Sequence, residues 1–552
     1  MNRRNFIQIG IAGAGILNAA GSSGEALAAT NKNMRRKSSD AIIVEATIAD
    51  LQAAMSSGKL TAKALTNLYL ARIHAIDKSG PNINAIIELN SDALAIAAAL
   101  DKERATKGPR GPLHGIPVLL KDNIATFDNM QTTAGSLALV GLKPPRDAFL
   151  VTQLREAGAV ILGKTNLSEW ANIRSSRATS GWSGRGGLTK NPYALDRNTS
   201  GSSSGSGASI AASLAAVAVG TETDGSIISP ANVNGLVGIK PTLGLISRNG
   251  IIPISHSQDT AGPMTRTVTD AAILLTAMAG SDKRDAATID ANKNKTDYTK
   301  FLKVDGLKGA RIGVVRANFD VANGANDLVV AVIEDALTVL KAQGAALIDV
   351  VLPNAGKYGD SEFQVLLYEL KADMAAYLAE FAPGAKIKTL QDIIDFNEKN
   401  KAKEMPYFGQ DTFIRAAKKG GLDSPEYLDA LANNHRYSRA EGIDAVMKEH
   451  NLDALVAPSG DVAWLTDCIK GDNSGGSFTS PAAVAGYPHI TVPAGAVYGL
   501  PVGISFVASA WSEPKLIQIA YAYEQASNLR RAPMFAKSIN PIMKTKANKA
   551  AG

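Results

Sequence analysis

Residues 199–226 read TSGSSSGSGASIAASLAAVAVGTETDGS, and this stretch decides both the fold and the chemistry expected of the chain. A loop dense in glycine and serine leads into a helix of small residues, then into a short apolar strand, and ends in a second glycine turn at Ser226. Glycine costs backbone entropy on folding, so proteins keep such loops mainly where the backbone closely approaches a ligand or a developing negative charge. The stretch therefore predicts a reactive centre at the end of a strand.

Helical patterns and short apolar strands alternate on either side of this stretch. The expected strands are residues 116–121, 159–163, 217–221, 236–240, 311–315, 346–352, 453–457, 489–493 and 501–507. The expected helices are one capped by Thr47 and Asp50 and others over 61–76, 92–105, 147–157, 208–216, 267–279, 327–343 and 513–526. Such alternation is typical of a mostly parallel sheet covered by helices. We predict one large α/β/α domain over residues 41–545, with a mainly helical insertion at about 360–450.

The N-terminus is typical of an export signal. Arg3 and Arg4 precede a moderately apolar stretch, residues 6–17, and residues 26–28 (Ala-Leu-Ala) supply the small side chains that a signal peptidase needs. We expect residues 1–28 to be a twin-arginine-type signal peptide, 29–40 to be a linker, and the mature protein to be periplasmic or secreted. The alternative is a buried N-terminal helix. The apolar stretch is too short for a stable membrane span, and no other stretch qualifies as one.

Composition argues against several classes of protein. The net charge of +7 is spread along the chain apart from a small cluster at 32–37, so we expect no nucleic-acid partner. Cys468 is the single cysteine, which makes an intrachain disulfide impossible. A structural metal site built on cysteine is not expected either.

Two residues in unusual settings indicate nucleophilic catalysis without histidine. Ser226 follows a tight glycine turn that can aim successive backbone N–H groups at one point, as an oxyanion hole requires. The alternative is an ordinary strand-to-loop turn. Lys121 ends a buried apolar strand, where burial would lower its pKa from about 10.4 and produce a neutral general base. The alternative is a lysine that reaches the surface and pairs with Asp122.

The serine-rich loop allows other interpretations. Residues 201–207 (GSSSGSG) resemble a flexible linker, but they lead directly into a helix, and they lack the lysine and Ser/Thr pair of a Walker phosphate loop. Residues 201–205 also fit the G-x-S-x-G elbow of an α/β-hydrolase, with Ser203 as nucleophile and a later histidine such as His489 as base. The residues before this loop are polar and turn-like, which argues against such an elbow.

Several motifs together carry a resemblance to a known family. GPLHGIPVLLKDN, LGKTNLSEWAN, GSSSGSGAS and GTETDGSIISPANVNGLVGIKPT occur in this order, followed by SQDTAGPM (257–264) and YAYEQ (521–525). In these motifs the chain resembles the amidase signature family, and within it the bacterial peptide amidases, over nearly the whole mature chain. The resemblance implies a hydrolase of linear amide C–N bonds with one α/β/α domain, a mixed central sheet and no metal or organic cofactor. We favour a monomer.

The family's site residues map onto positions of this sequence. The resemblance implies a Ser–cisSer–Lys triad with Ser226 as nucleophile, Ser202 as bridging serine and Lys121 as base. It also implies that Ser203 supports the lysine network. The oxyanion would be bound by the backbone amides of Thr223, Asp224, Gly225 and Ser226. The expected pocket residues are Trp170 and Asn172, and buried support is expected from Lys164, Asn166, Ser168 and Glu169.

The resemblance further implies a mechanism and a substrate. Neutral Lys121 takes a proton from Ser202 while Ser202 takes one from Ser226, which attacks the amide carbonyl and forms an acyl-enzyme. The implied substrate is the C-terminal carboxamide of a small peptide, hydrolysed to free acid and ammonia. The helical insertion would block longer chains. Alternatives are an amidase of broader specificity for small, aryl or acyl amides, an exported peptide-binding protein, and a component of an amidotransferase, which an export signal argues against.

Four positions depart from the family pattern. Ser200 and Asp224 stand where glycine is usual, Glu222 replaces an aspartate, and Ile228 replaces an arginine. These departures leave the three catalytic positions intact. They leave open the shape of the entrance and the exact specificity.

Overall fold

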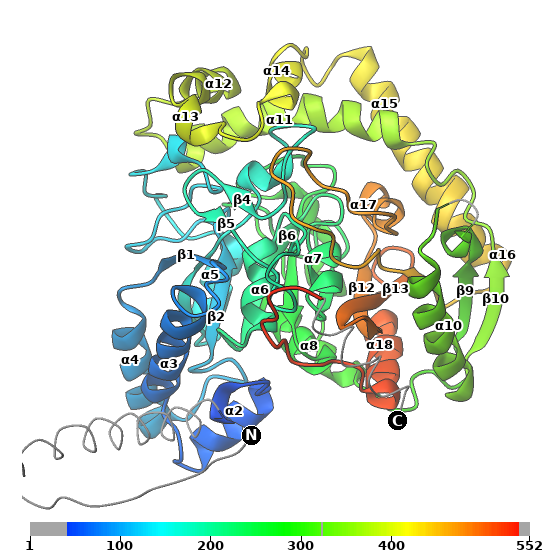
Figure 1. The fold of residues 1–552 in the computed structure, drawn as a ribbon, viewed down its shortest axis with the longest axis horizontal. Coiled ribbons are helices and arrows are strands. Elements are labelled where there is room, and N and C mark those ends of the chain that lie inside the picture. The colour runs from blue at the N-terminus through cyan, green and yellow to red at the C-terminus, as the bar shows by residue number, and fades with distance from the viewer. Residues whose placement is uncertain (1–40, 322–323, 540–552) are drawn as a thin grey trace, which may run out of the picture.

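The computed structural model describes residues 41–321 and 324–539 (Figure 1). The predicted signal peptide and linker, residues 1–40, lie outside the described residues, as does the end of the predicted domain beyond residue 539. Within the described ranges, no helix combines the length and the apolar character that a membrane crossing requires.

An eleven-stranded sheet forms the centre of the domain, in the order β1-β3-β2-β6-β8-β7-β12-β13-β11-β9-β10. Its strands are β1 (Ile86–Leu89), β2 (Pro117–Lys121), β3 (Val160–Thr165), β6 (Val217–Glu222), β7 (Val237–Lys240), β8 (Thr260–Thr265), β9 (Arg311–Val315), β10 (Ala346–Val350), β11 (Ala454–Pro458), β12 (His489–Val497) and β13 (Leu500–Val507). Every expected strand is present, and β1 and β8 are additional in this sheet. β4 (Trp182–Ser183) and β5 (Gly187–Leu188) form a separate two-stranded sheet that was not expected.

The sheet is mixed, and its parallel pairs form two blocks. Strands β3, β2 and β6 run parallel, as do β11, β9 and β10. The strands between these blocks pair antiparallel, so the centre of the sheet is more antiparallel than the helix–strand alternation indicates. One reason is the hairpin between β12 and β13, where Tyr498 and Gly499 both have positive φ, as a two-residue turn requires. Another reason is β8, which pairs antiparallel with β6 and β7. This strand was not expected, because Gly262 and Pro263 obscure its sequence pattern.

Helices cover both faces of the sheet. Every residue of β6, β11 and β13 is therefore buried, including the residues on either face of each strand. The main covering helices are α2 (Ile48–Ser56), α3 (Ala62–Arg72), α4 (Ala93–Lys107), α5 (Phe149–Glu156), α6 (Ser204–Ala211), α7 (Ile228–Val233), α8 (Val268–Met278), α10 (Asp327–Ala342) and α18 (Glu513–Ser527). The predicted capping box of Thr47 and Asp50 is present at the start of α2. Helix α6 begins at Ser204, earlier than predicted, so the serine-rich loop itself forms the first turn.

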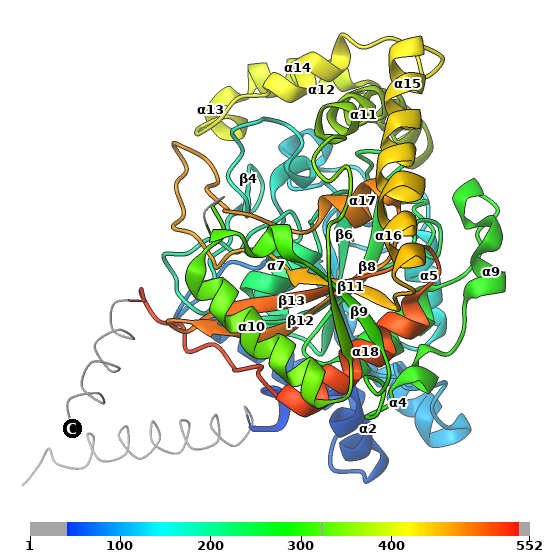
Figure 2. The same ribbon diagram turned by 90° about the vertical axis from the view of Figure 1, so that its right-hand side faces the viewer.

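The predicted insertion is helical and strandless. It contains α11 (Gly359–Phe381), α12 (Leu390–Lys399), α13 (Lys401–Glu404), α14 (Asp411–Ala417), α15 (Pro425–His435) and α16 (Asp444–Glu449). Helices α11 to α15 arch over one end of the sheet, at the top of Figures 1 and 2. The side chains described next lie at this end, where β2 and β6 finish and β8 begins.

Candidate active site

Lys121 is the last residue of β2, and its side chain is completely buried. Its Nζ atom donates to Ser202 Oγ at 2.7 Å, to Thr221 Oγ1 at 2.8 Å and to the carbonyl of Thr221 at 3.1 Å. Burial lowers the pKa of Lys121 to about 7, although the charges of Asp259 and Glu222 oppose this change. A neutral amine is therefore available at physiological pH.

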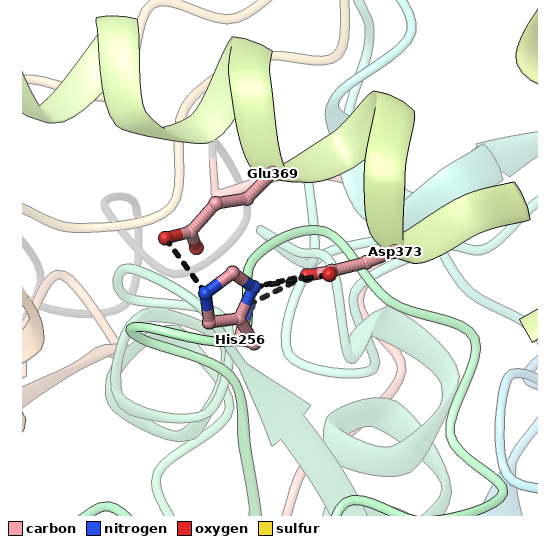
Figure 3. A group of neighbouring side chains, drawn as sticks. All are labelled: His256, Glu369 and Asp373. Carbon is pink, nitrogen blue, oxygen red and sulfur yellow. Dashed lines mark hydrogen bonds and ion pairs between the residues drawn. The ribbon is translucent and has the colours of Figure 1, made fainter. Parts of the chain in front are cut away.

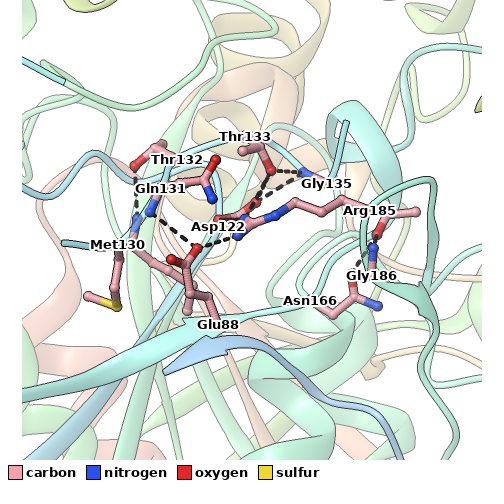
Figure 4. Close-up of polar contacts among 12 residues, drawn as sticks. Glu88, Asp122, Met130, Gln131, Thr132, Thr133, Gly135, Asn166, Arg185 and Gly186 are labelled. Carbon is pink, nitrogen blue, oxygen red and sulfur yellow. Dashed lines mark hydrogen bonds and ion pairs between the residues drawn. The ribbon is translucent and has the colours of Figure 1, made fainter. Parts of the chain in front are cut away.

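Asp122 points away from Lys121, because successive residues at the end of a strand face opposite sides. Its carboxylate accepts hydrogen bonds from Thr133 Oγ1, from the N–H of Gly135 at 3.1 Å and from Arg185 at 3.4 Å. Arg185 also pairs with Glu88, so it lies between two carboxylates (Figure 4). The interpretation of Lys121 as a surface lysine paired with Asp122 is therefore wrong.

The loop that carries Ser202 and Ser203 lies against the end of β6. The peptide bond between Gly201 and Ser202 is cis, and both serines are buried. Ser203 Oγ donates to the carbonyl of Thr221 at 3.0 Å and accepts from the N–H of the same residue at 3.2 Å. The N–H of Ser203 donates to the carbonyl of Ser226 at 3.2 Å. The structure thus brings Lys121, Ser202, Ser203 and the main chain of Ser226 into one cluster.

Residues 223–226, which we call the amide turn, connect β6 to the nucleophile position. Gly225 has φ +75°, a conformation that glycine adopts without strain. None of the four N–H groups of the amide turn donates a hydrogen bond to any described residue. Thr223, Gly225 and Ser226 are buried and Asp224 is half-buried. Buried N–H groups are almost always paired in folded proteins, so these consecutive unpaired donors beside Ser226 indicate a binding site for a negatively charged atom.

Side chains on three sides hold the amide turn in place. Glu222 accepts hydrogen bonds from the N–H groups of residues 227 and 228 at 2.7 and 2.9 Å, at the start of α7. Thr223 Oγ1 donates to Asp259, whose pKa burial raises to about 6. Asp224 accepts from Ser480 Oγ at 2.6 Å, on α17 (Ser480–Ala485). Two of the departures from the family pattern, Glu222 and Asp224, therefore contribute hydrogen bonds that hold this turn.

The predicted pocket residues belong to a left-handed turn. Trp170, Ala171 and Asn172 have φ of 51°, 53° and 77°. A residue other than glycine costs roughly 1–2 kcal/mol in this conformation, so the surrounding structure must impose it. The turn lies near the serine-rich loop, since the N–H of Ser168 donates to the carbonyl of Ser202 at 3.1 Å. Trp170 Nε1 and Asn172 Oδ1 have no hydrogen-bond partner among the described residues. Their contact with substrate stays a prediction.

A buried ion cluster connects this turn to the insertion. Arg174 pairs with Glu169, which directly precedes the turn, and donates to the carbonyl of Glu404 on α13 at 2.6 Å. The Glu404 carboxylate accepts from the N–H of Leu137 at 2.7 Å. All three charged side chains are completely buried. Glu169 is therefore structural support, as predicted. Lys164 is likewise buried and donates to the carbonyl of residue 124 at 2.6 Å.

The α/β-hydrolase interpretation of Ser203 is wrong. Ser203 follows an irregular loop rather than a strand, and its hydroxyl bonds Thr221. His489 lies on β12, and its Nε2 atom bonds Ser505 Oγ at 2.5 Å. Burial lowers the pKa of His489 to about 3. This histidine is therefore a core residue that bonds Ser505, and it does not act as the base for Ser203.

One further cluster involves ionisable groups on α11. His256 lies between Glu369 and Asp373 of this helix, and its Nδ1 atom is 2.9 Å from Asp373 (Figure 3). It is the one set of three potential metal ligands found in the described part of the chain. The Glu369 carboxylate is already occupied by hydrogen bonds from Ser255, Ser257 and Tyr427. We therefore interpret the cluster as a clasp between α11 and the loop at 254–259.

Some of these residues were not singled out from the sequence. Thr221 organises Lys121 and Ser203, and Asp259 holds Thr223. Glu362 of α11 accepts a hydrogen bond from Gln258, which also donates to the carbonyl of Thr223. Two signals were available for Thr221 and Asp259, because Thr221 is a polar residue at the end of a strand and Asp259 lies in the quoted SQDTAGPM motif. The position of Glu362 depends on how the insertion packs, which the sequence pattern does not indicate.

Comparison with known proteins agrees with this site. The Amidase family matches residues 64–517. A probable amidase of Arabidopsis thaliana is 44% identical over 513 residues, which cover 91% of this chain and 93% of the relative. The native peptide amidase of Stenotrophomonas maltophilia is a solved structure with 51% identity and a TM-score of 0.84, covering 89% of this chain and 99% of the other. A component of the glutamyl-tRNA(Gln) amidotransferase of Microcystis aeruginosa is 36% identical and covers 86% of this chain and 96% of the relative.

The chain therefore belongs to the amidase signature family, and it is a hydrolase of amide carbon–nitrogen bonds. Its fold matches that of the solved peptide amidase over nearly the full length of that enzyme. The prediction from the motifs is confirmed at this level.

Proposed function

We propose that this protein is a serine amidohydrolase that removes the C-terminal carboxamide of peptides through an acyl-enzyme on Ser226. The observation that carries the proposal is the hydrogen bond between Lys121 and Ser202 beside the four unpaired N–H groups of the amide turn. A neutral amine, a hydroxyl relay and preset oxyanion donors are the parts that amide hydrolysis without histidine requires.

The proposed reaction begins with Lys121 in its neutral form. Lys121 accepts the proton of Ser202 while Ser202 accepts that of Ser226, and Ser226 Oγ attacks the carboxamide carbon. The amide turn binds the resulting oxyanion through the N–H groups of residues 223–226. Collapse of this intermediate breaks the carbon–nitrogen bond, and ammonia leaves with a proton returned through Ser202. Water then attacks the acyl-enzyme by the same relay and releases the free acid.

The substrate class rests on similarity. Two of the neighbours of 51% identity are described as peptide amidases, one of them in complex with the competitive inhibitor chymostatin. The insertion arching over this end of the sheet agrees with a substrate that ends at the scissile bond (Figure 2). A broader amidase acting on small, aryl or acyl amides is the second candidate, because the curated relatives include amidases without a stated substrate.

Mass spectrometry of peptide products tests the proposal. An amidated peptide is expected to gain one dalton on incubation with the protein and to release ammonia, with its internal bonds intact. Ser226→Ala is expected to lower kcat by at least about 10⁴-fold. Ser206→Ala is the matched control, since Ser206 is a buried serine of α6 whose hydroxyl bonds Thr165 and the carbonyl of Val219 rather than Lys121, Ser202 or Ser226. Internal cleavage, or activity unchanged in Ser226→Ala, would contradict the proposal.

We also propose that residues 1–28 direct export, on the strength of the paired arginines and the Ala-Leu-Ala site. In a bacterial host, the exported protein is then expected to begin at Ala29. Replacement of both Arg3 and Arg4 by lysine is expected to retain the protein in the cytoplasm with residues 1–28 attached. Normal export of that double variant would contradict this proposal.

A further inference from the structure

Gln258 lies between the amide turn and α11. Its side chain is almost completely buried, and its Nε2 atom donates to the carbonyl of Thr223 at 3.3 Å and to Glu362 Oε1 at 2.9 Å. A carbonyl oxygen can only accept a hydrogen bond, so the NH₂ group of Gln258 must face Thr223. Gln258 thereby connects the turn that carries the proposed oxyanion donors to a helix of the insertion.

The bond to Thr223 acts directly on one of those donors. The carbonyl of Thr223 and the N–H of Asp224 belong to the same planar trans peptide unit, in which the two groups point in opposite directions. A hydrogen bond that holds the carbonyl on one side therefore fixes the direction of the Asp224 N–H on the other side. That N–H is among the four donors without a partner in the described part of the chain.

Gln258 is itself held by α11. The loop at 254–259 is bound to this helix by Glu369, which accepts from Ser255 Oγ at 2.5 Å and from the N–H of Ser257 at 3.0 Å. His256 lies between Glu369 and Asp373 on the same helix (Figure 3). The backbone of Gln258 thus has little freedom to move away from the amide turn.

Glu362 completes the connection from the helix. It is largely buried, and burial together with the nearby Asp224 carboxylate raises its pKa well above the usual range. The uncharged carboxyl is therefore favoured, which avoids repulsion between two carboxylates behind the amide turn.

We propose that Gln258 is a positioning residue of the oxyanion hole, and that Glu362 acts through it to couple the helical insertion to catalysis. The inference rests on the proposed function, and it adds that the insertion orients the donor at Asp224. Neither side chain needs to touch the substrate.

The test compares turnover with binding of a transition-state analogue. Removal of an oxyanion donor costs about 10²–10³-fold in kcat, and a donor that is present but misaligned is expected to cost about 10- to 100-fold. Gln258→Ala is therefore expected to lower kcat by that factor with KM nearly unchanged. Affinity for a peptide aldehyde, whose adduct with Ser226 places an oxygen in the hole, is expected to fall by the same factor as kcat/KM. Gln258→Met fills the same space and replaces the alanine variant should that variant unfold.

Two controls separate positioning from a general loss of packing. Gln410→Ala removes a buried glutamine that lies in the insertion and bonds Asn397 and Ile394, and it is expected to leave both quantities unchanged. Glu362→Gln keeps an oxygen for Gln258 and is expected to keep most activity. Glu362→Leu is expected to resemble Gln258→Ala, and the double variant to lose no more than either single variant.

The outcomes are distinct. Equal aldehyde affinity in the wild type and Gln258→Ala, or losses that multiply in the double variant, would overturn the role of Gln258 while wild-type amidase activity stands. A wild-type protein that neither releases ammonia nor binds the aldehyde would overturn the proposed function and this inference with it.

Discussion

The Nζ atom of Lys121 lies 2.7 Å from the Oγ atom of Ser202, although the two residues are 81 positions apart in the chain. Lys121 ends β2, and Ser202 lies in the loop that enters α6, a helix that packs against β2, β3, β6 and β8. The contact therefore depends on how helix and sheet pack together. It is the feature that turns a buried lysine into a candidate base.

Lys121→Met is expected to remove activity and to stabilise the folded protein most strongly at low pH. The folded pKa of about 7 lies below the ordinary value of 10.5, so below pH 7 the fold must carry a buried charge, at a cost of roughly 5 kcal/mol at most. This cost declines as the pH rises from 7 and disappears near 10.5. Thermal melting from pH 6 to pH 10 measures it. A variant whose advantage over the wild type grows with pH would contradict the assignment.

Ser203→Ala is expected to lower kcat about 10- to 100-fold and stability by about 1–2 kcal/mol, because Thr221 loses both hydrogen bonds to the Ser203 hydroxyl. Because Thr221 in turn holds Lys121, the loss is expected in kcat, and KM is expected to change little. Steady-state kinetics and urea unfolding check the two effects. Ser209→Ala on α6 is the matched control, since the one hydrogen bond of its hydroxyl within the described residues is to the carbonyl of Ser206. Equal activity of both variants would refute a supporting role for Ser203.

The local elements were predictable because each depends on a short pattern. The apolar run that ends at Lys121 spans only a few residues, and so does the capping box that begins at Thr47. The pairing of segments that are distant in the chain was harder to predict from the sequence. Strand β8 was missed because Gly262 and Pro263 break the pattern of a strand, and its antiparallel pairing with β6 and β7 was missed with it.

The candidate site shows the same division. The positions of Ser202, Ser203 and Ser226 followed from motifs, whereas the contacts of Thr221, Gln258 and Glu362 depend on tertiary packing. The left-handed turn at 170–172 was also not predictable, because tryptophan and alanine, the residue types at 170 and 171, do not favour positive φ. The pairing of Glu169, which directly precedes the turn, with the buried Arg174 is likewise a tertiary contact.

Arg174→Met is expected to destabilise the protein by about 3–5 kcal/mol, because it leaves Glu169 and Glu404 buried without a cation. The exposed pair of Lys401 and Glu398 lies in the same insertion, and Lys401→Ala is expected to change stability by less than about 0.5 kcal/mol. Denaturant unfolding of both variants measures the difference. Similar values for the two would show that the buried cluster does not anchor the insertion.

The clasp at His256 is expected to stabilise the protein at acidic pH. Its hydrogen bond to Asp373 raises the pKa of His256, while burial and the charge of Arg248 oppose the change. A raised pKa means that the contribution is fully present below the unfolded value of 6.5 and is lost as the pH rises through the folded value. His256→Ala should therefore lower the melting temperature more at pH 5.5 than at pH 9. His450→Ala, in a weaker contact with Glu449 at 3.8 Å, is the control. A deficit in His256→Ala that is independent of pH would contradict the clasp.

The pH dependence of kcat/KM for an amidated peptide tests the central claim most directly, because it reports the ionisation of the free enzyme's base. Burial brings the pKa of Lys121 to about 7, and the active form is the neutral amine. Our account predicts that kcat/KM rises through a single ionisation near pH 7 and levels off above it. A profile that is flat from pH 5 to 9, or that falls as the pH rises through 7, would contradict Lys121 as the base.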